Sequence, residues 1–375
     1  MTRAVDSKSA LALDPQADSG VDLPVRIWSV VALVPAHQEE AQVAATVRSL
    51  RAQTYPIEEI LVIADNCTDR TEEFARAAGA SVMHTVGNTG RKAGALNQGL
   101  AAIAHRLDEY SLVLEMDADS ELADDWIEQA VRLMEIEPDL AGLSGYYLAK
   151  DVEVDGPMAR ALAWWQKAEF ARATRTRVRR DATVLSGTAT IFRASALMEV
   201  RADQGYVWDP ASRVEDYRIT TELRVRGWVT HATHRCRTRT DVMLTPQAWW
   251  RQRTRWQLGT LEELDDRGWR TETRVDWIRQ AGLYTGSLFR LLTMLFLLGF
   301  LLPTWVVYGF TFSVAWTLLF LSLGLRQAWT VREAGPGSMI LAFLVIPEEI
   351  YGTARDIVAA RSAWLFATGR GPSGW

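Results

Sequence analysis

Short apolar runs alternate with helical patterns in the first third of the chain. Four runs rich in Val, Ile and Leu have the length and composition of buried strands, at 28–36, 60–65, 80–84 and 111–116. Between the first three runs, residues 42–53 and 71–78 place apolar side chains at three- and four-residue spacing, which is typical of helices packed on one face. The order β-α-β-α-β predicts an α/β fold with a mostly parallel sheet, flanking helices and right-handed crossovers.

Longer apolar runs dominate the C-terminal part of the chain. Residues 283–325 carry one charged side chain, Arg290, and their length suffices for two membrane spans of about 20 residues each. Pro303 and Thr304 offer a break between these spans. A third run, 339–347, has only about half the length of a span, which favours a re-entrant or interfacial segment.

Arginines flank the apolar region on both sides. Arg274 and Arg279 precede it, and Arg326 and Arg332 follow it. A hairpin with both ends on one side would place all four on the cytoplasmic face, in keeping with the positive-inside tendency. We therefore expect an integral protein of an inner or plasma membrane, with its preceding α/β domain in the cytoplasm.

The 375 residues exceed the usual size of one domain, which supports a soluble domain with a membrane appendage. The expected segments are a flexible polar leader at 1–24, the α/β domain at 25–260, an interfacial linker at 261–282, a transmembrane helical hairpin at 283–325, and re-entrant or interfacial helices at 326–375. A net charge of −5, from 41 basic and 46 acidic residues, argues against nucleic acid as a partner. Two cysteines, Cys67 and Cys236, cannot form a disulfide framework, so a reducing compartment is the simpler assumption.

Polar side chains follow the predicted strands at the points where the strands end. Pro35 to Glu39 end the first strand, Asp65 ends the second, and Asp117-Ala118-Asp119 follows the run at 111–116. In an open parallel sheet, ligands bind outside the carboxyl ends of the strands. The first strand is followed by neither a G-x-G-x-x-G dinucleotide fingerprint nor a phosphate-loop G-K-[ST]. Any nucleotide would therefore be held by side chains.

The D-x-D pair is the first candidate for chemistry. Asp117 and Asp119 share one face of an extended chain, and two carboxylates there can share a hard cation such as Mg²⁺ or Mn²⁺. The plain alternative is a solvated turn, but the buried strand directly before the pair favours a cation that bridges a diphosphate. Lys92, within 90–97, has two nearby glycines that would let this loop approach phosphates; its alternative is an ordinary surface charge.

A possible metal motif occurs late in the domain, at His231, His234 and Cys236. No fourth ligand of the zinc type lies nearby in the sequence. Residues 229–236 fit an edge strand better than a zinc site.

Five motifs occur in the order found in family 2 glycosyltransferases, and the chain resembles that family over roughly residues 28–260. The motifs are Val34 to Glu39 with Asp65, the loop 90–97, Asp117-Ala118-Asp119, Glu215-Asp216, and Gln252-x-x-Arg255-Trp256. The resemblance is greatest to the membrane-bound, inverting branch that includes cellulose, chitin, hyaluronan and poly-N-acetylglucosamine synthases. It implies a GT-A fold and transfer of a sugar from a UDP-sugar.

The resemblance assigns roles to residues on the donor side. Pro35, Ala36, Glu39 and Asp65 would border the uridine pocket. Lys92 and Arg255 would lie near the diphosphate, Asp117 near the ribose and diphosphate, and Asp119, with Asp117, would bind Mg²⁺ or Mn²⁺.

The resemblance also assigns the catalytic and acceptor roles. Asp216, next to Glu215, would be the general base that takes the proton of the acceptor hydroxyl. Gln252 and Trp256 would bind the acceptor, and the segment Ser186-Gly187-Thr188 resembles the one that lines the acceptor pocket. For the last segment, a small-residue turn into a strand is an equally good interpretation.

The helix predicted around Q-x-x-R-W has a second interpretation. Its tryptophans and arginines, between Trp249 and Trp256, suit a helix at the lipid headgroup boundary, and the two roles are compatible. The same applies to residues 158–175.

Three functions remain open from the sequence. The leading one is a UDP-sugar transferase that builds a glycan at the membrane, with a carbohydrate, lipid-linked or protein acceptor. A second is a single-transfer enzyme acting on a polyprenyl phosphate or a protein, and a third is an inactive membrane scaffold. Membrane lipid and a second copy of the chain are the other expected partners.

Overall fold

The computed structural model describes residues 28–151, 154–309, 314–344 and 346–371. The expected leader at 1–24 lies outside the described residues. Within them, one sheet is formed by β1 Ser29–Ala36, β2 Glu59–Ala64, β3 Ser81–His84, β4 Ser111–Met116, β5 Ser120–Leu122, β6 Leu140–Ala149, β7 Arg179–Arg180, β8 Ala189–Arg193 and β9 Val229–Thr240. The helices around it are α1 Val43–Arg51, α2 Thr71–Ala77, α3 Arg91–Ile103, α4 Trp126–Ile136, α5 Pro157–Arg177, α6 Ala194–Gln204, α7 Glu215–Val225 and α8 Pro246–Arg267.

The four predicted strands and two predicted helices are all present, with ends that differ by one or two residues. The strand order is β3-β2-β1-β4-β8-β6-β9-β5, and β7 pairs with β9. The first four neighbours are parallel, as predicted. Beyond β4 the sheet is mixed, because β8 runs antiparallel to both of its neighbours. Parallel pairing thus occurs in two places, among β1 to β4 and between β6 and β9.

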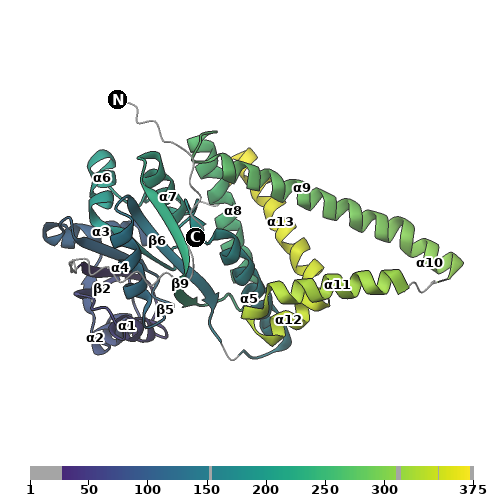
Figure 1. Ribbon diagram of the computed structural model, residues 1–375, viewed down its shortest axis with the longest axis horizontal. Coiled ribbons are helices and arrows are strands. Elements are labelled where there is room, and N and C mark those ends of the chain that lie inside the picture. The colour runs from purple at the N-terminus through teal and green to yellow at the C-terminus, as the bar shows by residue number, and fades with distance from the viewer. Residues whose placement is uncertain (1–27, 152–153, 310–313, 345, 372–375) are drawn as a thin grey trace.

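The alternation of side chains along β1 explains why the sheet is covered on both faces. Val30, Ala32 and Val34 pack in one core with α1 and α4, whereas Val31 and Leu33 pack in the other with α3 and α6. Figure 1 shows these helices on opposite sides of the sheet. Because both faces are buried, β1 is apolar along its whole length rather than at alternate positions.

The prediction of an edge strand at 229–236 is wrong. β9 pairs with β6 along one side and with β7 and β5 along the other. Its polar sequence is accommodated because β5 and β7 are short, and several of its side chains remain exposed beyond them. Cys236 is buried and contacts Trp126 O, whereas His231 lies 3.5 Å from Glu137.

The C-terminal region consists of long helices that leave the α/β domain and return to it. They are α9 Arg274–Phe296, a π-helical turn Leu297–Leu301, α10 Leu302–Tyr308, α11 Val314–Thr330, α12 Pro336–Phe343 and α13 Ile346–Thr368. In Figure 1, α9 and α10 extend away from the sheet, α11 runs back, and α13 lies between α8 and α9. Together, α9, α10 and α11 have the outline of a hairpin.

The predicted break at Pro303 and Thr304 is wrong. The helix that starts at Arg274 continues without interruption to Tyr308. Pro303 falls in the first turn of α10, and the π-helical turn precedes it, so the missing backbone N–H is accommodated without ending the helix. In the described part of the chain, Arg274–Tyr308 is the one helix long and apolar enough to cross a membrane, and none of its most apolar stretch is buried. The second span stays a prediction.

Two of the segments expected at a lipid boundary pack mainly against protein. Trp249 and Arg253 of α8 are buried, and α8 contacts α13 along much of its length. α5, which covers the other such segment, contacts β6 and α12 and buries Phe170. The mixture of tryptophan and arginine on α8 therefore serves an internal contact at these positions, in place of lipid headgroups.

Candidate active site

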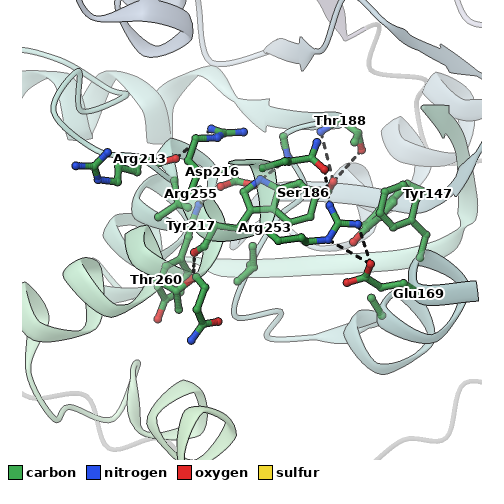
Figure 2. A pocket seen from close by; sticks show the side chains of 18 of the residues that line it. Tyr147, Glu169, Ser186, Thr188, Arg213, Asp216, Tyr217, Arg253, Arg255 and Thr260 are labelled. Carbon is green, nitrogen blue, oxygen red and sulfur yellow. Dashed lines mark hydrogen bonds and ion pairs between the residues drawn. The ribbon is translucent and has the colours of Figure 1, made fainter. Parts of the chain in front are cut away.

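A cavity of about 650 Å³ lies between the carboxyl end of β4 and the helices α5, α7, α8, α9 and α13. Figure 2 shows side chains from several of these elements gathered around it, among them Asp216, Arg253 and Arg255. Eleven of the residues predicted for the site line this cavity: Lys92, Asp117, Asp119, Ser186, Gly187, Thr188, Glu215, Asp216, Gln252, Arg255 and Trp256. Segments that are far apart in the sequence thus meet in one space.

Lys92, on the first turn of α3, is the centre of an acidic cluster. Its Nζ lies 2.6 Å from Asp117 Oδ1, 3.0 Å from Glu115 Oε1 and 3.5 Å from Glu215 Oε1. It also donates a hydrogen bond of 3.0 Å to Gly187 O. Burial opposes the charge on Lys92, but these carboxylates raise its pKa well above the usual value. Lys92 is therefore a charged side chain that is held in place in the lining of the cavity, and it is not an ordinary surface lysine.

The D-x-D pair extends from β4 toward the cavity. The backbone N–H of Asp117 donates to Thr188 O at 3.2 Å, and Ala118 between the two aspartates is buried in the core. Both carboxylates consequently lie on the cavity side. Burial raises the pKa of Asp117 to about 6, although Lys92 opposes this effect.

A third aspartate, Asp241, lies next to the D-x-D pair and was not identified from the sequence. It follows β9, lines the cavity, and is held by Gln42 Nε2 at 2.8 Å and Lys150 Nζ at 3.6 Å. Burial, followed by the charge of Asp241, raises the pKa of Asp119. Two neighbouring carboxylates in a polar cavity form a donor set suited to a hard divalent cation.

The described residues do not form a complete metal site on their own. No group of three or more His, Cys, Asp or Glu side chains lies close enough together to hold an ion within the described ranges. The oxygens of Asp119 and Asp241 are chemically appropriate for Mg²⁺ or Mn²⁺, and these ions commonly keep water or take phosphate oxygens as further ligands. An ion bound by Asp119 and Asp241 would therefore complete its coordination with water or with oxygens of a phosphate ligand.

Asp216 lies in the first turn of α7, next to Glu215 of the acidic cluster, and lines the same cavity. Its Oδ1 accepts a hydrogen bond of 2.8 Å from Tyr217 N, and its Oδ2 accepts one of 3.2 Å from Gly187 N. Burial and the charge of Glu215 raise the pKa of Asp216, whereas Lys92 and these N–H groups oppose the rise. The carboxylate is thus fixed in orientation and made more basic than an exposed aspartate.

Gly187 lets the backbone pass between Lys92 and Asp216. A Cβ atom at this position would lie 3.0 Å from Lys92 Nζ and 3.5 Å from Asp216 Oδ2. Ser186 and Thr188 flank it with side-chain hydroxyls 2.8 Å apart. The segment therefore joins the cation and the carboxylate through its own N–H and C=O groups, and both flanking hydroxyls border the cavity.

The residues predicted for the uridine pocket lie at the neighbouring strand ends and outside the lining of this cavity. Pro35 and Ala36 pair in register with the end of β2, and Asp65 Oδ1 accepts a hydrogen bond of 2.8 Å from Thr85 Oγ1. Glu39 is nearer to the D-x-D pair: burial and the charges of the pair raise its pKa to about 7. These residues lie beside the cavity, at or just after the ends of β1 and β2.

Gln38 connects the loops that follow β1 and β2. Its side chain donates to Thr68 Oγ1 at 2.7 Å and accepts from Thr68 N at 2.9 Å. The glutamine therefore fixes the loop after β1 to the loop after β2, beside the residues predicted for the uridine pocket.

The Q-x-x-R-W residues project from α8, whose first turn is capped by Thr245. Arg255 donates to Arg213 O at 3.1 Å, and no carboxylate lies within ion-pair distance of it in the part of the chain that the structure describes. Arg253, the first of the two residues between Gln252 and Arg255 in the motif, lies over the Trp256 ring at 4.4 Å. Arg255 is therefore available for an anionic ligand, and one face of the Trp256 ring is covered by Arg253.

A buried ion pair between Arg253 and Glu169 was also not predicted from the sequence. Arg253 is 6% exposed, and its Nη2 lies 2.7 Å from Glu169 Oε2 on α5. Tyr351 on α13 donates to the same carboxylate at 2.6 Å and accepts from Trp249 Nε1 at 2.9 Å. Burial would raise the pKa of Glu169, but Arg253 and Arg355 lower it to about 2. No sequence pattern links these residues, because they come from three separate helices.

Residues 31–201 match the family described as glycosyl transferase family 2. The chain carries a family 2 glycosyltransferase domain. The matched range of this domain begins in β1 and ends in α6, so it contains Lys92, the D-x-D pair and residues 186–188. Asp216 and the Q-x-x-R-W helix follow it along the chain and join it in the cavity.

Curated relatives of this chain are poly-beta-1,6-N-acetyl-D-glucosamine synthases. The protein from Staphylococcus aureus (strain COL) is 24% identical over 262 residues, which cover 68% of this chain and 59% of the relative. The protein from Staphylococcus epidermidis is 27% identical over 248 residues, covering 64% and 56%. The chain thus spans less than two thirds of the length of these relatives.

The fold of this chain is also found among solved structures. A mannosyltransferase from Pyrobaculum calidifontis, solved in complex with GDP-Man and Mn²⁺, superposes with a TM-score of 0.56 at 14% identity. The superposition covers 93% of this chain and 89% of the other. The predicted GT-A fold class is confirmed.

Proposed function

We propose that this protein is an inverting glycosyltransferase that moves a sugar from a UDP-sugar to an acceptor hydroxyl at the cytoplasmic face of a membrane, in the synthesis of a glycan or polysaccharide. The observation that carries the proposal is the meeting of Lys92, the D-x-D pair, Asp216 and Arg255 around one cavity. Cations and carboxylates suited to a metal ion thus lie beside a carboxylate that burial makes more basic. This combination matches the needs of a diphosphate leaving group and a hydroxyl nucleophile.

On the donor side, the strand ends hold the nucleotide. Pro35, Ala36, Glu39 and Asp65 border the uracil and ribose, with Asp65 accepting a hydrogen bond from the base. Asp117 lies toward the ribose and diphosphate. The solved mannosyltransferase binds a nucleotide diphosphate sugar, GDP-Man, with Mn²⁺, which supports a donor of this chemical class.

The metal would bind on the donor side of the cavity. Asp119 and Asp117 would hold Mg²⁺ or Mn²⁺, and Asp241 is placed to assist them. When bound, the ion neutralises charge on the diphosphate. Lys92 already pairs with Asp117, so it keeps that carboxylate ionised and oriented.

The chemical step is a displacement at the anomeric carbon. The acceptor oxygen forms a bond to that carbon, the bond from the carbon to the β-phosphate oxygen breaks, and its electron pair leaves with UDP. Asp216 Oδ takes the hydroxyl proton as the nucleophile attacks. Arg255 and Lys92 face the charge that develops on the departing diphosphate. Because the nucleophile attacks opposite the leaving group, the anomeric configuration inverts.

On the acceptor side, Trp256 offers an aromatic face to a sugar ring, and Gln252, Ser186 and Thr188 supply polar groups for its hydroxyls. Gly187 gives the backbone the close approach that places Asp216 beside the nucleophile. Glu215 supports the base by raising its pKa. The similarity to poly-beta-1,6-N-acetyl-D-glucosamine synthases supports a carbohydrate product.

The segments after residue 260 anchor the catalytic domain to the membrane. We assign 25–260 to catalysis, 261–282 to an interfacial linker, 283–325 to a membrane hairpin, and 326–375 to helices at or in the interface. The exposed apolar surface of the helix Arg274–Tyr308 supports the assignment. A second copy of the chain could complete a transmembrane path.

The test is UDP release by the detergent-purified chain with a panel of UDP-sugars, in Mg²⁺, Mn²⁺ or EDTA. Release from one donor that stops in EDTA is the expected result and would name the sugar. Asp119→Ala should raise the metal concentration needed for half-maximal release, whereas Asp265→Asn, an exposed aspartate outside the cavity, serves as the matched control and should not. The absence of release from every donor, even with added membrane lipid extract, would favour an inactive scaffold.

A further inference from the structure

The cavity does not end at the acceptor residues of α8. It continues to a wall formed by α9 and α13, which belong to the region beyond the catalytic domain. The residues of this wall are Asp276, Arg279, Gln280, Leu283, Arg355, Val358 and Ala359. The catalytic carboxylates and the first residues of the long apolar helix therefore border the same space.

This wall changes from polar to apolar along its length. Arg279 is held by Asp276 Oδ1 at 3.0 Å and by Thr183 Oγ1 at 2.6 Å, so its charge is already neutralised. Leu283 lies one turn further along α9 and begins the apolar stretch. Val358 and Ala359 of α13 are each only 3% exposed and still face the cavity. The far end of the cavity thus offers aliphatic surface to a ligand.

The aliphatic end leads toward the outside of the domain. The helix Arg274–Tyr308 contains Leu283, and its most apolar stretch is not covered by any described part of the chain. Leu288 and Leu291, on the turns after Leu283, are each more than half exposed. Ser287 and Arg290 lie on the same face of α9 as Leu283 and contact Asp356 of α13. An apolar chain that starts beside Leu283 would therefore pass these polar groups on the side of Leu288 and Leu291 to reach lipid.

We propose that the acceptor is an amphiphilic lipid whose polar head carries a free hydroxyl. This inference rests on the proposed function. The head lies between Asp216 and Trp256, and the alkyl chain lies against Leu283, Val358 and Ala359. A hydroxyl head is favoured over a phosphate head because both arginines of the wall are paired, Arg279 with Asp276 and Arg355 with Glu169. In addition, Asp216 is held in place to accept a proton that a phosphate dianion lacks. A soluble sugar acceptor would leave the aliphatic wall unused.

The experiment compares acceptors that share a head and differ in the chain. Methyl and n-octyl β-glucoside, methyl and n-octyl N-acetyl-β-glucosaminide, and glycerol and monooctanoylglycerol form three such pairs, each used below its micelle concentration. We expect kcat/KM for the octyl member of at least one pair to exceed that of its short partner by about tenfold or more. Farnesyl phosphate is a separate arm, and its use in preference to the hydroxyl lipids would overturn the hydroxyl head.

Leu283→Trp fills the aliphatic end of the cavity and should bring the ratio of octyl to short acceptor close to one. The ratio compares two acceptors in the same preparation, so a loss of folded protein does not alter it. Ile278→Trp is the matched control, since Ile278 is on the same helix, 61% exposed, and outside the cavity lining, and it should keep the wild-type ratio.

Failure of the octyl acceptors in every pair would overturn the inference, whichever short acceptor is used. UDP release to water or to a short acceptor would then still support the proposed function. Loss of UDP release with every acceptor and with water would instead contradict the proposed function itself.

Discussion

The Tyr351 hydroxyl donates a hydrogen bond of 2.6 Å to Glu169 Oε2. This bond joins α13, which follows the expected membrane hairpin, to α5 of the catalytic domain. The same carboxylate pairs with Arg253, and Arg253 lies over the Trp256 ring. The C-terminal helix is therefore linked to Trp256, the proposed acceptor residue, through three contacts, and we expect it to position that ring.

Tyr351→Phe should weaken acceptor binding without changing donor binding. The variant loses the bond to Glu169 and the bond from Trp249, which costs about 1–2 kcal/mol of stability. We expect a several-fold rise in the KM for acceptor with the UDP Kd unchanged, measured by kinetics and calorimetry. Tyr308→Phe, at an exposed tyrosine on α10, is the control. An equal change in both constants would point to a purely structural effect.

The stability of the protein should fall at low pH through Glu169. Burial raises the pKa of this carboxyl, but Arg253 and Arg355 lower it to about 2, below the usual 4.5. A lowered pKa stabilises the fold fully above pH 4.5, and this stabilisation is lost as the pH falls toward 2. Thermal unfolding in detergent between these pH values should show a steeper decline for wild type than for Glu169→Gln. Parallel declines would exclude this contribution.

The acid limb of the pH–rate profile should report Asp216. The base must be ionised, and burial together with the charge of Glu215 raises its pKa above 3.8. Activity should therefore rise with pH through a midpoint above that value. Glu215→Gln removes one negative neighbour, so the midpoint of kcat/KM should move to lower pH. A midpoint that stays in place or moves up would show that another group controls this limb.

Lys92→Met should destabilise the protein more than the loss of a surface lysine. It leaves Glu115, Asp117 and Glu215 without their shared cation, and breaking such a buried pair costs about 3–5 kcal/mol. Lys167→Met is the matched control: its partner Asp151 is largely exposed, and a pair of this kind contributes about 1 kcal/mol or less. The two melting temperatures in detergent make the comparison, and equal losses would contradict a central role for Lys92.

The sequence predicted those features that depend on local pattern. The strands β1, β2 and β4 are apolar along almost their whole length because both sheet faces are covered there, and the acidic motifs follow these strands. The roles of Asp117, Asp119 and Asp216 stay predictions, although the structure brings these residues to one cavity.

Features that depend on distant partners could not be predicted in this way. Asp241 is an isolated aspartate after β9, and its position beside Asp119 follows from the pairing of β9 with β5. Arg253 in a tryptophan- and arginine-rich helix suggests a lipid boundary until Glu169 and Tyr351 are seen to cover it. Pro303 suggested a helix end because the sequence does not show the π-helical turn that accommodates it.

Asp216→Asn separates donor binding from chemistry, because asparagine keeps the shape of the side chain and cannot take the proton. UDP affinity by calorimetry and UDP-sugar turnover should be measured on the same preparation. We predict that the Kd for UDP stays within about twofold, while turnover falls about 100- to 10,000-fold, as expected when a general base is removed. Near-normal turnover in this variant would contradict the role of Asp216 as the base.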